Sequence, residues 1–394
     1  MKSNHHFSQE VLDYIDSQKS VSIHRLLLKK SPFERVEMRS IVQQIQGVNV
    51  AEKKFPFLIN FQQYRYPPKI SLEQASSQAT AVYKSSLMNG KSIIDMTGGM
   101  GIDTYYFSLL FENTTYLEPN IDLFNISKYN FEVLKANNID AQSITCETYL
   151  DKKTQLFDWV YIDPSRRISG NRKTSIHNYE PNIVTLKDDL LKTGKNVMIK
   201  MSPMQDISEC IKVLGNVSHV WIVSNNNEVK ELLIQIGQEA CDNPKLTVKD
   251  VGNKYNFEVS TDIKSRRVEI ENGPVKKYIY QPYSSIVKAE LQNSLAAANK
   301  LYKIHNNTQL FTSDILKKKY LGRIFEVEIL TTPNRKLIST HLRENKANII
   351  TKNFPLSPKE LAKKLKLKDG GSDYLLAFTD FNEKKRVAIC NRIQ

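Results

Sequence analysis

A short apolar run followed by a glycine-rich turn constrains this chain more than any other feature. The segment reads Ser92-Ile93-Ile94-Asp95-Met96-Thr97-Gly98-Gly99-Met100-Gly101-Ile102-Asp103. It predicts a buried strand that enters a tight turn, from which a helix begins. Glycines allow the backbone to approach a ligand closely at such a turn, and the helix N-terminus offers free N–H groups. We therefore expect the first βα unit of a ligand-binding α/β sheet.

The residues around the turn distinguish two classes of ligand. A dinucleotide pyrophosphate requires G-x-G-x-x-G, but Thr104 stands at the third glycine position. Asp95 also places an anion at the pocket, which suits a cationic ligand without phosphate, and S-adenosylmethionine is such a ligand. Glu118 follows the next predicted strand and is expected to bind the ribose hydroxyls, while Glu147 follows a third and is expected near the adenine amine. The residues predicted to bind this donor are Asp95, Gly98, Gly99, Gly101, Glu118 and Glu147.

Short apolar runs alternate with amphipathic segments through the middle of the chain. We expect helices over 121–136 and 181–192, and strands at Ser92–Met96, Thr115–Leu117, Ser143–Cys146, Trp159–Ile162, Val197–Ile199 and Val217–Val223. Strands that alternate with helices predict βαβ units. The expected fold class is therefore α/β, with a Rossmann-like, doubly wound parallel sheet.

The chain on either side of this region follows other patterns. Apolar residues recur every three or four positions over 8–48, which predicts helices, one of them beginning at Ser31-Pro32 and ending at Gly47. Another helix is expected from Ser71, with Val82 on its apolar side. After Gly237 the pattern predicts hairpin strands at Leu246–Val251 and Asn256–Ser260, a long helix near 284–303, and a β-rich basic tail. We divide the chain into a helical segment (1–88), a donor-binding domain (89–240), a connecting α+β region (241–325) and a basic α+β region (326–394).

The fourth predicted strand leads directly into residues that suit a reacting site. Trp159–Ile162 is followed by Asp163-Pro164-Ser165-Arg166-Arg167, and the carboxyl end of such a strand faces the ligand crevice. Methyl transfer requires a positioned nucleophile more than acid–base help. Asp163 and Pro164 are predicted to hydrogen-bond that nucleophile, and Arg166 and Arg167 to orient a phosphate or carboxylate.

The positive charge of the chain is confined to its C-terminal third. Residues 264–394 hold 26 basic and 12 acidic side chains, whereas residues 1–263 hold 30 of each, so the C-terminal part accounts for the formal charge of +14. This split indicates a polyanionic partner, and it favours a nucleic acid over a small substrate. Cys146, Cys210, Cys241 and Cys390 form no CxxC pair, so we expect neither a structural zinc nor disulfides. No apolar run approaches the ~18–20 residues of a membrane span, and the polar N-terminus lacks a signal-peptide core, so we expect a cytoplasmic protein.

These motifs together resemble a known family. The stretches Asp95–Asp103 and Asp163–Arg167 are similar to those of class I S-adenosylmethionine-dependent methyltransferases, and most of all to the bacterial group with a C-terminal THUMP-like domain. Other stretches that carry the resemblance are Leu72–Ser77, Lys200–Met204, Asn227–Leu233, Asn353–Leu356 and Leu367–Gly371. The resemblance implies a donor site at Asp95, Gly99, Gly101 and Glu118, a substrate-facing turn at Asp163–Arg167, and a THUMP-like fold for residues 326–394. THUMP domains are associated with RNA binding, so the leading hypothesis is a methyltransferase that acts on structured RNA such as tRNA or rRNA.

The substrate-facing turn departs from one related pattern. Enzymes that methylate exocyclic amines of nucleic-acid bases carry Asp/Asn-Pro-Pro-aromatic there, but this chain has Ser165 and Arg166 in the last two positions. A ring that stacks on the base must then come from elsewhere, and Tyr161, Tyr179 and Trp221 are the candidates. Two alternatives therefore stay open. One is a non-catalytic RNA-binding or assembly module with a degenerate fold, and the other is a methyltransferase for a small acidic molecule or a protein.

Overall fold

The computed structural model describes residues 6–152, 155–166, 175–239 and 241–394. The chain divides into two compact units. Unit 1 comprises Met1–Asn225, Lys230–Pro244 and Val251–Asn256, and unit 2 comprises Asn226–Val229, Lys245–Asp250 and Phe257–Gln394. In the described part of the chain, no helix combines the length and apolar character needed to cross a bilayer.

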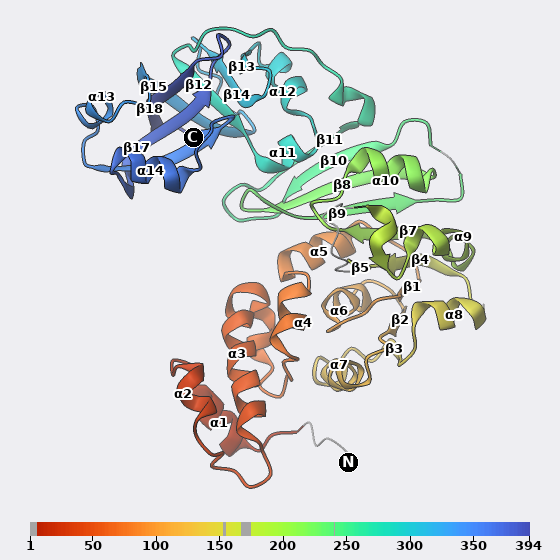
Figure 1. The fold of residues 1–394 in the computed structure, drawn as a ribbon. Helices are drawn as coiled ribbons and strands as arrows, with labels where there is room; N and C mark the ends of the chain where they lie inside the picture. The colour runs from red at the N-terminus through yellow and green to blue at the C-terminus, as the bar shows by residue number, and fades with distance from the viewer. Residues whose placement is uncertain (1–5, 153–154, 167–174, 240) are drawn as a thin grey trace. The chain divides into compact units, whose positions relative to one another are not determined.

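Unit 1 begins with a group of helices, coloured red to orange in Figure 1. They are α1 (Gln9–Ser17), α2 (Ile23–Leu27), α3 (Met38–Lys54), the 3₁₀ helix η1 (Pro56–Asn60), α4 (Lys69–Gln74) and α5 (Gln78–Ser86). The predicted start at Ser31 and end at Gly47 are wrong, because α3 begins at Met38 and runs through Gly47 to Lys54. Gly47 is a packing residue, since a Cβ there would stand 2.1 Å from the Cβ of Tyr66. The single helix expected from Ser71 is wrong as well, because the chain forms two helices, α4 and α5, and leaves the helical path at Ala75. Its predicted apolar side is also wrong: Val82 is exposed, and Thr80, Ala81, Lys84 and Ser85 are buried.

Seven neighbouring strands of one sheet follow these helices in unit 1, in the order β8-β9-β7-β4-β1-β2-β3. The strands are β1 (Ser92–Asp95), β2 (Asn113–Leu117), β3 (Ile139–Gln142), β4 (Phe157–Ile162), β7 (Gly194–Met201), β8 (Val217–Asn225) and β9 (Glu228–Ile236). The neighbouring strands from β7 to β3 pair in parallel, which confirms the predicted Rossmann-like α/β class.

The sheet differs from the prediction at two strands. The strand expected at Ser143–Cys146 is wrong, because β3 lies earlier in the chain and Cys146 begins α8 (Cys146–Lys152). The unpredicted β9 pairs antiparallel with β7. Asn226 and Asn227 adopt left-handed backbone angles, with φ of 51° and 66°, and thereby form the tight turn that leads from β8 to β9. The sheet is therefore mixed, because β7 pairs in parallel with β4 and antiparallel with β9.

Helices cover both faces of the sheet in unit 1. Figure 1 shows α6 (Ile102–Ser108) and α7 (Ile121–Val133) on one face, where α6 packs against α5. The other face carries α8, α9 (Ile183–Thr193) and α10 (Ile207–Leu214), of which α9 contacts the other two. Leu72 and Ala81 of the N-terminal helices share a buried apolar cluster with Met100 and Ile102. The N-terminal helices are thus packed directly against the glycine-rich turn.

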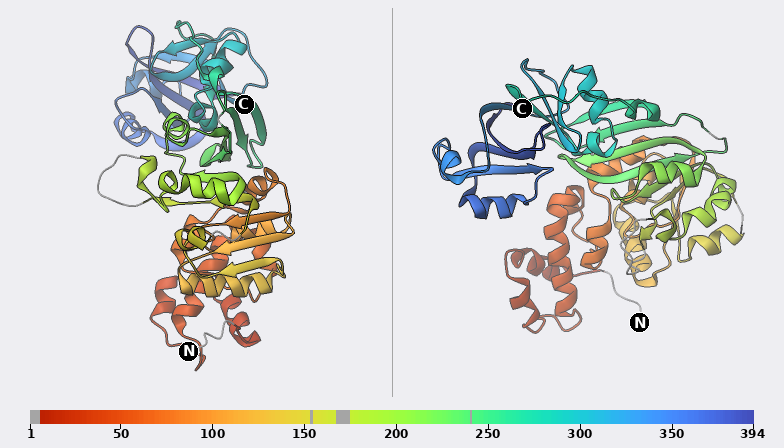
Figure 2. Two further views of the ribbon diagram at one scale, coloured as in Figure 1. Left: turned by 90° about the vertical axis from the view of Figure 1, so that its right-hand side faces the viewer. Right: turned by 45° about the horizontal axis from the view of Figure 1, so that its top comes forward.

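Unit 2 contains a hairpin and a second sheet. The hairpin joins β10 (Lys245–Asp250) and β11 (Phe257–Asp262). The seven-stranded sheet has the order β13-β14-β12-β15-β18-β17-β16, and its last strands are blue in the two views of Figure 2. Its strands are β12 (Tyr278–Pro282), β13 (Tyr302–His305), β14 (Thr308–Ser313), β15 (Gly322–Thr331), β16 (Lys346–Lys352), β17 (Lys368–Thr379) and β18 (Lys385–Arg392). The predicted β-rich C-terminal α+β region is confirmed.

The helices of unit 2 are short. They are η3 (Ile263–Arg266), α11 (Ser284–Lys288), α12 (Gln292–Ala298), α13 (Arg335–Ser339) and α14 (Pro358–Leu365). The single long helix expected near 284–303 is wrong, because Glu290 and Lys300 have left-handed φ angles of 58° and 53°. These two residues interrupt the helical path, and the chain then enters β13.

Candidate functional site

A cavity of about 1140 Å³ lies in unit 1 at the carboxyl ends of β1, β2, β4 and β7. The first residues after these strands line it, together with the loop before α5 and the start of α8. Parallel strands end at the same edge of a sheet, which is where ligands of open α/β sheets bind. The cavity is large enough for a drug-sized organic ligand and a second group beside it.

The glycine-rich turn forms the floor of this cavity. Gly99 and Gly101 have φ angles of 56° and 78°, which residues with a Cβ rarely adopt. A Cβ at Gly98 would lie 2.0 Å from the ring of Tyr116, whereas one at Gly99 would meet only the carbonyl of Thr97, at 3.9 Å. Gly99 therefore presents bare backbone to open space, as a cradle for a closely bound ligand requires.

Asp95 ends β1 inside this cradle. Its side chain is 1% exposed and accepts hydrogen bonds from the Thr97 amide at 3.1 Å and the Thr104 hydroxyl at 2.7 Å. Burial raises the pKa of the Asp95 carboxyl to about 7, and the nearby carboxylates of Asp103 and Asp163 add to the shift. A cation in the cavity would therefore stabilise the ionised form of Asp95.

Glu118 follows β2 on the adjoining wall. Its two oxygens accept from the amides of Gly99 at 3.1 Å and Asn120 at 2.8 Å, which fixes the carboxylate against the glycine-rich turn. Burial raises the pKa of Glu118 above its usual range. Each oxygen keeps a lone pair beyond the one used by the backbone, so vicinal hydroxyl groups of a ligand fit this carboxylate.

The opposite wall holds Asp163 and Pro164 after β4. The amide of Asp163 donates to the Thr97 hydroxyl at 2.6 Å, and its carboxylate forms an ion pair with Lys200 of β7. Burial alone lowers the pKa of Lys200, but the carboxylates of Asp163 and Glu231 outweigh it and raise that pKa above its usual range. Tyr179 lies on the same wall, in the two-residue strand β6 (Tyr179–Glu180) that pairs with β5 (Ser165–Arg166).

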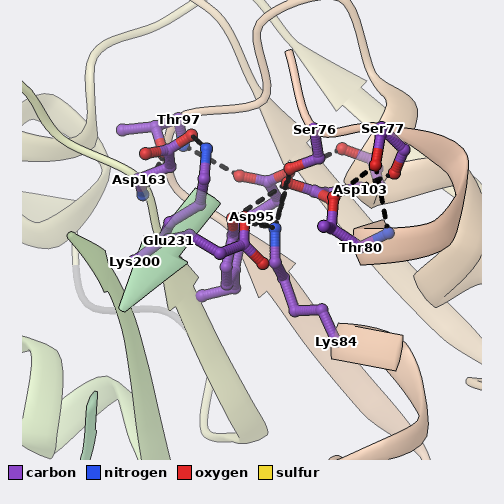
Figure 3. A network of polar contacts seen from close by, with 12 residues as sticks. Ser76, Ser77, Thr80, Lys84, Asp95, Thr97, Asp103, Asp163, Lys200 and Glu231 are labelled. Carbon is purple, nitrogen blue, oxygen red and sulfur yellow. Dashed lines mark hydrogen bonds and ion pairs between the residues drawn. The ribbon is translucent and has the colours of Figure 1, made fainter. Parts of the chain in front are cut away.

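A buried polar network lies beside Asp95, and Figure 3 shows its members. Lys84 of α5 is fully buried, and its ammonium contacts Asp103 at 2.8 Å, Tyr161 at 3.0 Å and Glu231 at 3.4 Å. Glu231 also acts electrostatically on Lys200. The charges thus alternate from Asp163 through Lys200, Glu231 and Lys84 to Asp103. One end of the network is at the Asp163 wall, and the other is Asp103 in the first turn of α6, directly after the glycine-rich turn.

Known proteins share both the fold and the C-terminal region of this chain. Residues 322–392 match a family described as THUMP domain-like, and residues 278–320 match a ferredoxin-like domain. A crystal structure of a proposed methyltransferase from Porphyromonas gingivalis W83 superposes with a TM-score of 0.85 at 26% identity, over 98% of this chain and 100% of that one. Uncharacterized S-adenosylmethionine-dependent methyltransferases from two strains of Mycobacterium tuberculosis are each 22% identical over 76% of this chain and 80% of their own.

The chain is a methyltransferase-fold protein with a C-terminal THUMP-like domain. The resemblance noted from the motifs is therefore confirmed.

Within the methyltransferase fold, the structure brings most of the predicted site residues together. The predicted residues that line this cavity are Asp95, Gly98, Gly99, Gly101, Glu118, Glu147, Asp163 and Pro164. Glu147 reaches it from the first turn of α8, where it is exposed, although the strand predicted before it is absent. The backbone of Arg166 belongs to β5 beside this wall. Arg167 lies outside the described residues.

Sequence reasoning missed the buried network. Lys84, Asp103 and Glu231 belong to three elements, and only the fold brings them into contact. One signal was available, because Lys84 lies three residues after Ala81 and so shares its side of a helix. Of the three candidate stacking rings, Trp221 stacks on His219 and does not line the cavity, whereas Tyr161 and Tyr179 both line it. The hydroxyl of Tyr161 belongs to the buried network.

Proposed function

We propose that this chain is an S-adenosylmethionine-dependent methyltransferase that acts on RNA. One observation carries the proposal. A single cavity joins the glycine-rich turn and the two carboxylates Asp95 and Glu118 to the Asp163-Pro164 turn on the opposite wall. The glycine-rich turn with its two carboxylates suits a cationic nucleoside without phosphate. The Asp163-Pro164 turn suits a nucleophile that must be positioned for in-line transfer.

The donor half of the site matches the parts of S-adenosylmethionine. Glu118 binds the ribose hydroxyls, Gly99 allows close approach, and Glu147 lies at the edge that suits the adenine. Asp95 supplies negative charge near the sulfonium. When bound, the donor supplies an electrophilic methyl group, and no acid is needed to activate it.

The substrate half positions the attacking group. The ion pair with Lys200 and the bond to Thr97 hold Asp163 in one orientation, so its carboxylate can accept a hydrogen bond from an amine. Pro164 adds rigidity to the turn. Tyr179 replaces the aromatic residue that the turn itself lacks, and we assign to it the stacking on a target base.

Positive charge supports RNA as the substrate. Unit 2 holds residues 264–394, which carry the +14 excess and match the THUMP domain-like family over part of their length. Charge also gathers beside the cavity, where burial and the ammonium groups of Lys200 and Lys230 lower the pKa of Lys54 to about 8. We assign phosphate contacts to Arg166 and Arg167 as well. The four cysteines are all unpaired, which agrees with a cytoplasmic enzyme.

The test uses RNA from a strain that lacks the protein. Wild type with tritiated S-adenosylmethionine should incorporate label, and Glu118→Ala should lose at least ten-fold in donor affinity by calorimetry. Glu112→Ala replaces an exposed glutamate of the same unit and should bind the donor like wild type. Donor binding without label in RNA would indicate a small acidic molecule or a protein as substrate. No donor binding by wild type would leave the RNA-binding module as the explanation.

A further inference from the structure

One carboxylate oxygen of Asp103 accepts three hydrogen bonds, and the other accepts none from the described residues. Its Oδ2 accepts from the Ser76 hydroxyl at 2.8 Å, the Lys84 ammonium at 2.8 Å and the Tyr161 hydroxyl at 2.9 Å. Its Oδ1 is buried and has no hydrogen-bond partner among the described residues. The side chain is only 10% exposed and lines the cavity. A buried carboxylate oxygen without a donor is costly, so the cavity ligand is expected to supply that donor.

The three donors to Oδ2 fix the direction in which Oδ1 points. They come from the loop before α5, from α5 itself and from β4, and Figure 3 shows Lys84 and Ser76 together at Asp103. Burial alone raises the pKa of Asp103, but the ammonium groups of Lys84 and Lys200, together with the hydrogen bonds from Lys84 and Ser76, outweigh it and hold that pKa below its usual range. Lys84 is thus a positioning residue that keeps Asp103 ionised and immobile.

The place of Asp103 in the fold selects the part of the donor that it meets. If Glu118 binds the ribose after β2, the other end of the donor would have to occupy the part of the cavity lined by Asp95 and Asp163, at the ends of β1 and β4. Asp103 lies on that side, because it packs against Tyr161 of β4. The methionine end of the donor carries a carboxylate, which an aspartate repels, and an ammonium, which donates hydrogen bonds.

We propose that Asp103 binds the α-ammonium group of S-adenosylmethionine through Oδ1. This inference rests on the proposed function, because it requires the cavity to bind that donor. It adds a binding residue that comes from the helix after the glycine-rich turn and is held in place by the N-terminal helices. It also explains why a lysine is fully buried on α5, where an apolar residue would pack at lower cost.

The test changes protein and ligand separately. Calorimetry compares S-adenosylhomocysteine with its analogue in which hydrogen replaces the α-amino group. Wild type should bind the analogue roughly 10- to 100-fold more weakly, as expected for a lost charge-assisted hydrogen bond. Asp103→Asn should weaken S-adenosylhomocysteine by a similar factor and leave the affinity for the analogue within about two-fold of wild type.

Controls separate this role from a structural one. Asp140→Asn replaces an exposed aspartate of β3 and should leave both affinities unchanged. Equal binding of the two ligands by wild type would overturn the inference, and that measurement does not depend on the folding of a variant. Equal loss of both ligands in Asp103→Asn would assign Asp103 a structural role and also overturn it. If wild type bound neither ligand, the proposed function would fail along with the inference.

Discussion

At the scale of single residues, the most constrained group is the carboxyl of Asp95. It is buried at the end of β1, and the like charges of Asp103 and Asp163 oppose its ionisation, while the bonds from Thr97 and Thr104 favour it. The net result is a pKa of about 7 in the folded protein. An unfolded aspartate titrates near 3.9. The folded state therefore binds this proton more tightly than the unfolded state does.

This difference predicts how stability depends on pH. The stabilising contribution of Asp95 to the free energy of unfolding is fully present below about pH 4 and is lost as pH rises through 7. Asp95→Asn cannot ionise, so wild type should lose about 3 kcal/mol relative to this variant between pH 5 and pH 8. Urea unfolding followed by tryptophan fluorescence measures this, because both tryptophans, Trp159 and Trp221, are buried in unit 1. Asp140→Asn is the control for an aspartate-to-asparagine substitution. If the difference in free energy of unfolding between wild type and Asp95→Asn did not change with pH, the prediction would be contradicted.

At the scale of elements, α5 is held to the sheet by one buried charge. Lys84 pairs with Asp103 of α6 and Glu231 of β9, and neither partner is more than 10% exposed. Lys84→Met would remove the ammonium that contacts both carboxylates. Breaking a buried pair from one side costs about 3–5 kcal/mol, so we expect a loss of this size in the free energy of unfolding, measured by the same fluorescence.

A surface ion pair provides the matched control. Lys195 contacts Asp158 at 2.7 Å but is 62% exposed. Lys195→Met should cost less than about 1 kcal/mol, because solvent already screens the pair. Similar costs for the two lysine variants would mean that burial of Lys84 adds no stability.

The same elements show what sequence patterns can and cannot predict. Strands such as β1 and β4 were predictable because their apolar residues form a compact run before a polar turn. β3 reads Ile-Asp-Ala-Gln and has no such run, so its position depends on pairing with β2. The face of α5 was misassigned for a related reason, because its buried side carries polar residues. The hydroxyls of Thr80 and Ser85 donate to backbone carbonyls three residues earlier, whereas Lys84 binds Tyr161, which is 77 residues away in the sequence.

The features of the candidate site also divide into those that the sequence predicts and those that only the folded structure shows. Asp95, Glu118 and Asp163 were predictable because each lies at the carboxyl end of a predicted strand, and parallel strands end at one edge of a sheet. The pairing of Asp163 with Lys200 was not, since it depends on β4 and β7 being neighbours. The role of Asp103 depends on contacts from α5 and β4, so only the folded chain shows that one of its oxygens is engaged and the other is not.

At the scale of the whole molecule, chemistry and charge are assigned to different units. Unit 1 holds the cavity, and unit 2 holds the basic residues 264–394. In unit 2, Leu361, Leu365 and Leu367 pack into a buried apolar cluster. The lysines between and after them, Lys363, Lys364, Lys366 and Lys368, are exposed. The leucines are thus used by the core, which leaves the lysines free to meet a polyanion.

This arrangement predicts that the affinity for RNA depends on salt concentration through the basic residues of unit 2. The logarithm of affinity for bulk tRNA should fall steeply with the logarithm of salt concentration, with a slope of roughly 0.7–0.9 per phosphate neutralised. Replacing Lys363, Lys364, Lys366 and Lys368 by Ala should reduce that slope by about 2 to 3. The full chain with Lys91, Lys128, Lys135 and Lys152 replaced by Ala is the control, because these four lysines are exposed on unit 1. Each variant loses four positive charges, so an effect of net charge alone would flatten both slopes equally. A flattened slope confined to the first variant would show that unit 2 contacts the RNA, whereas equal slopes would contradict the assignment.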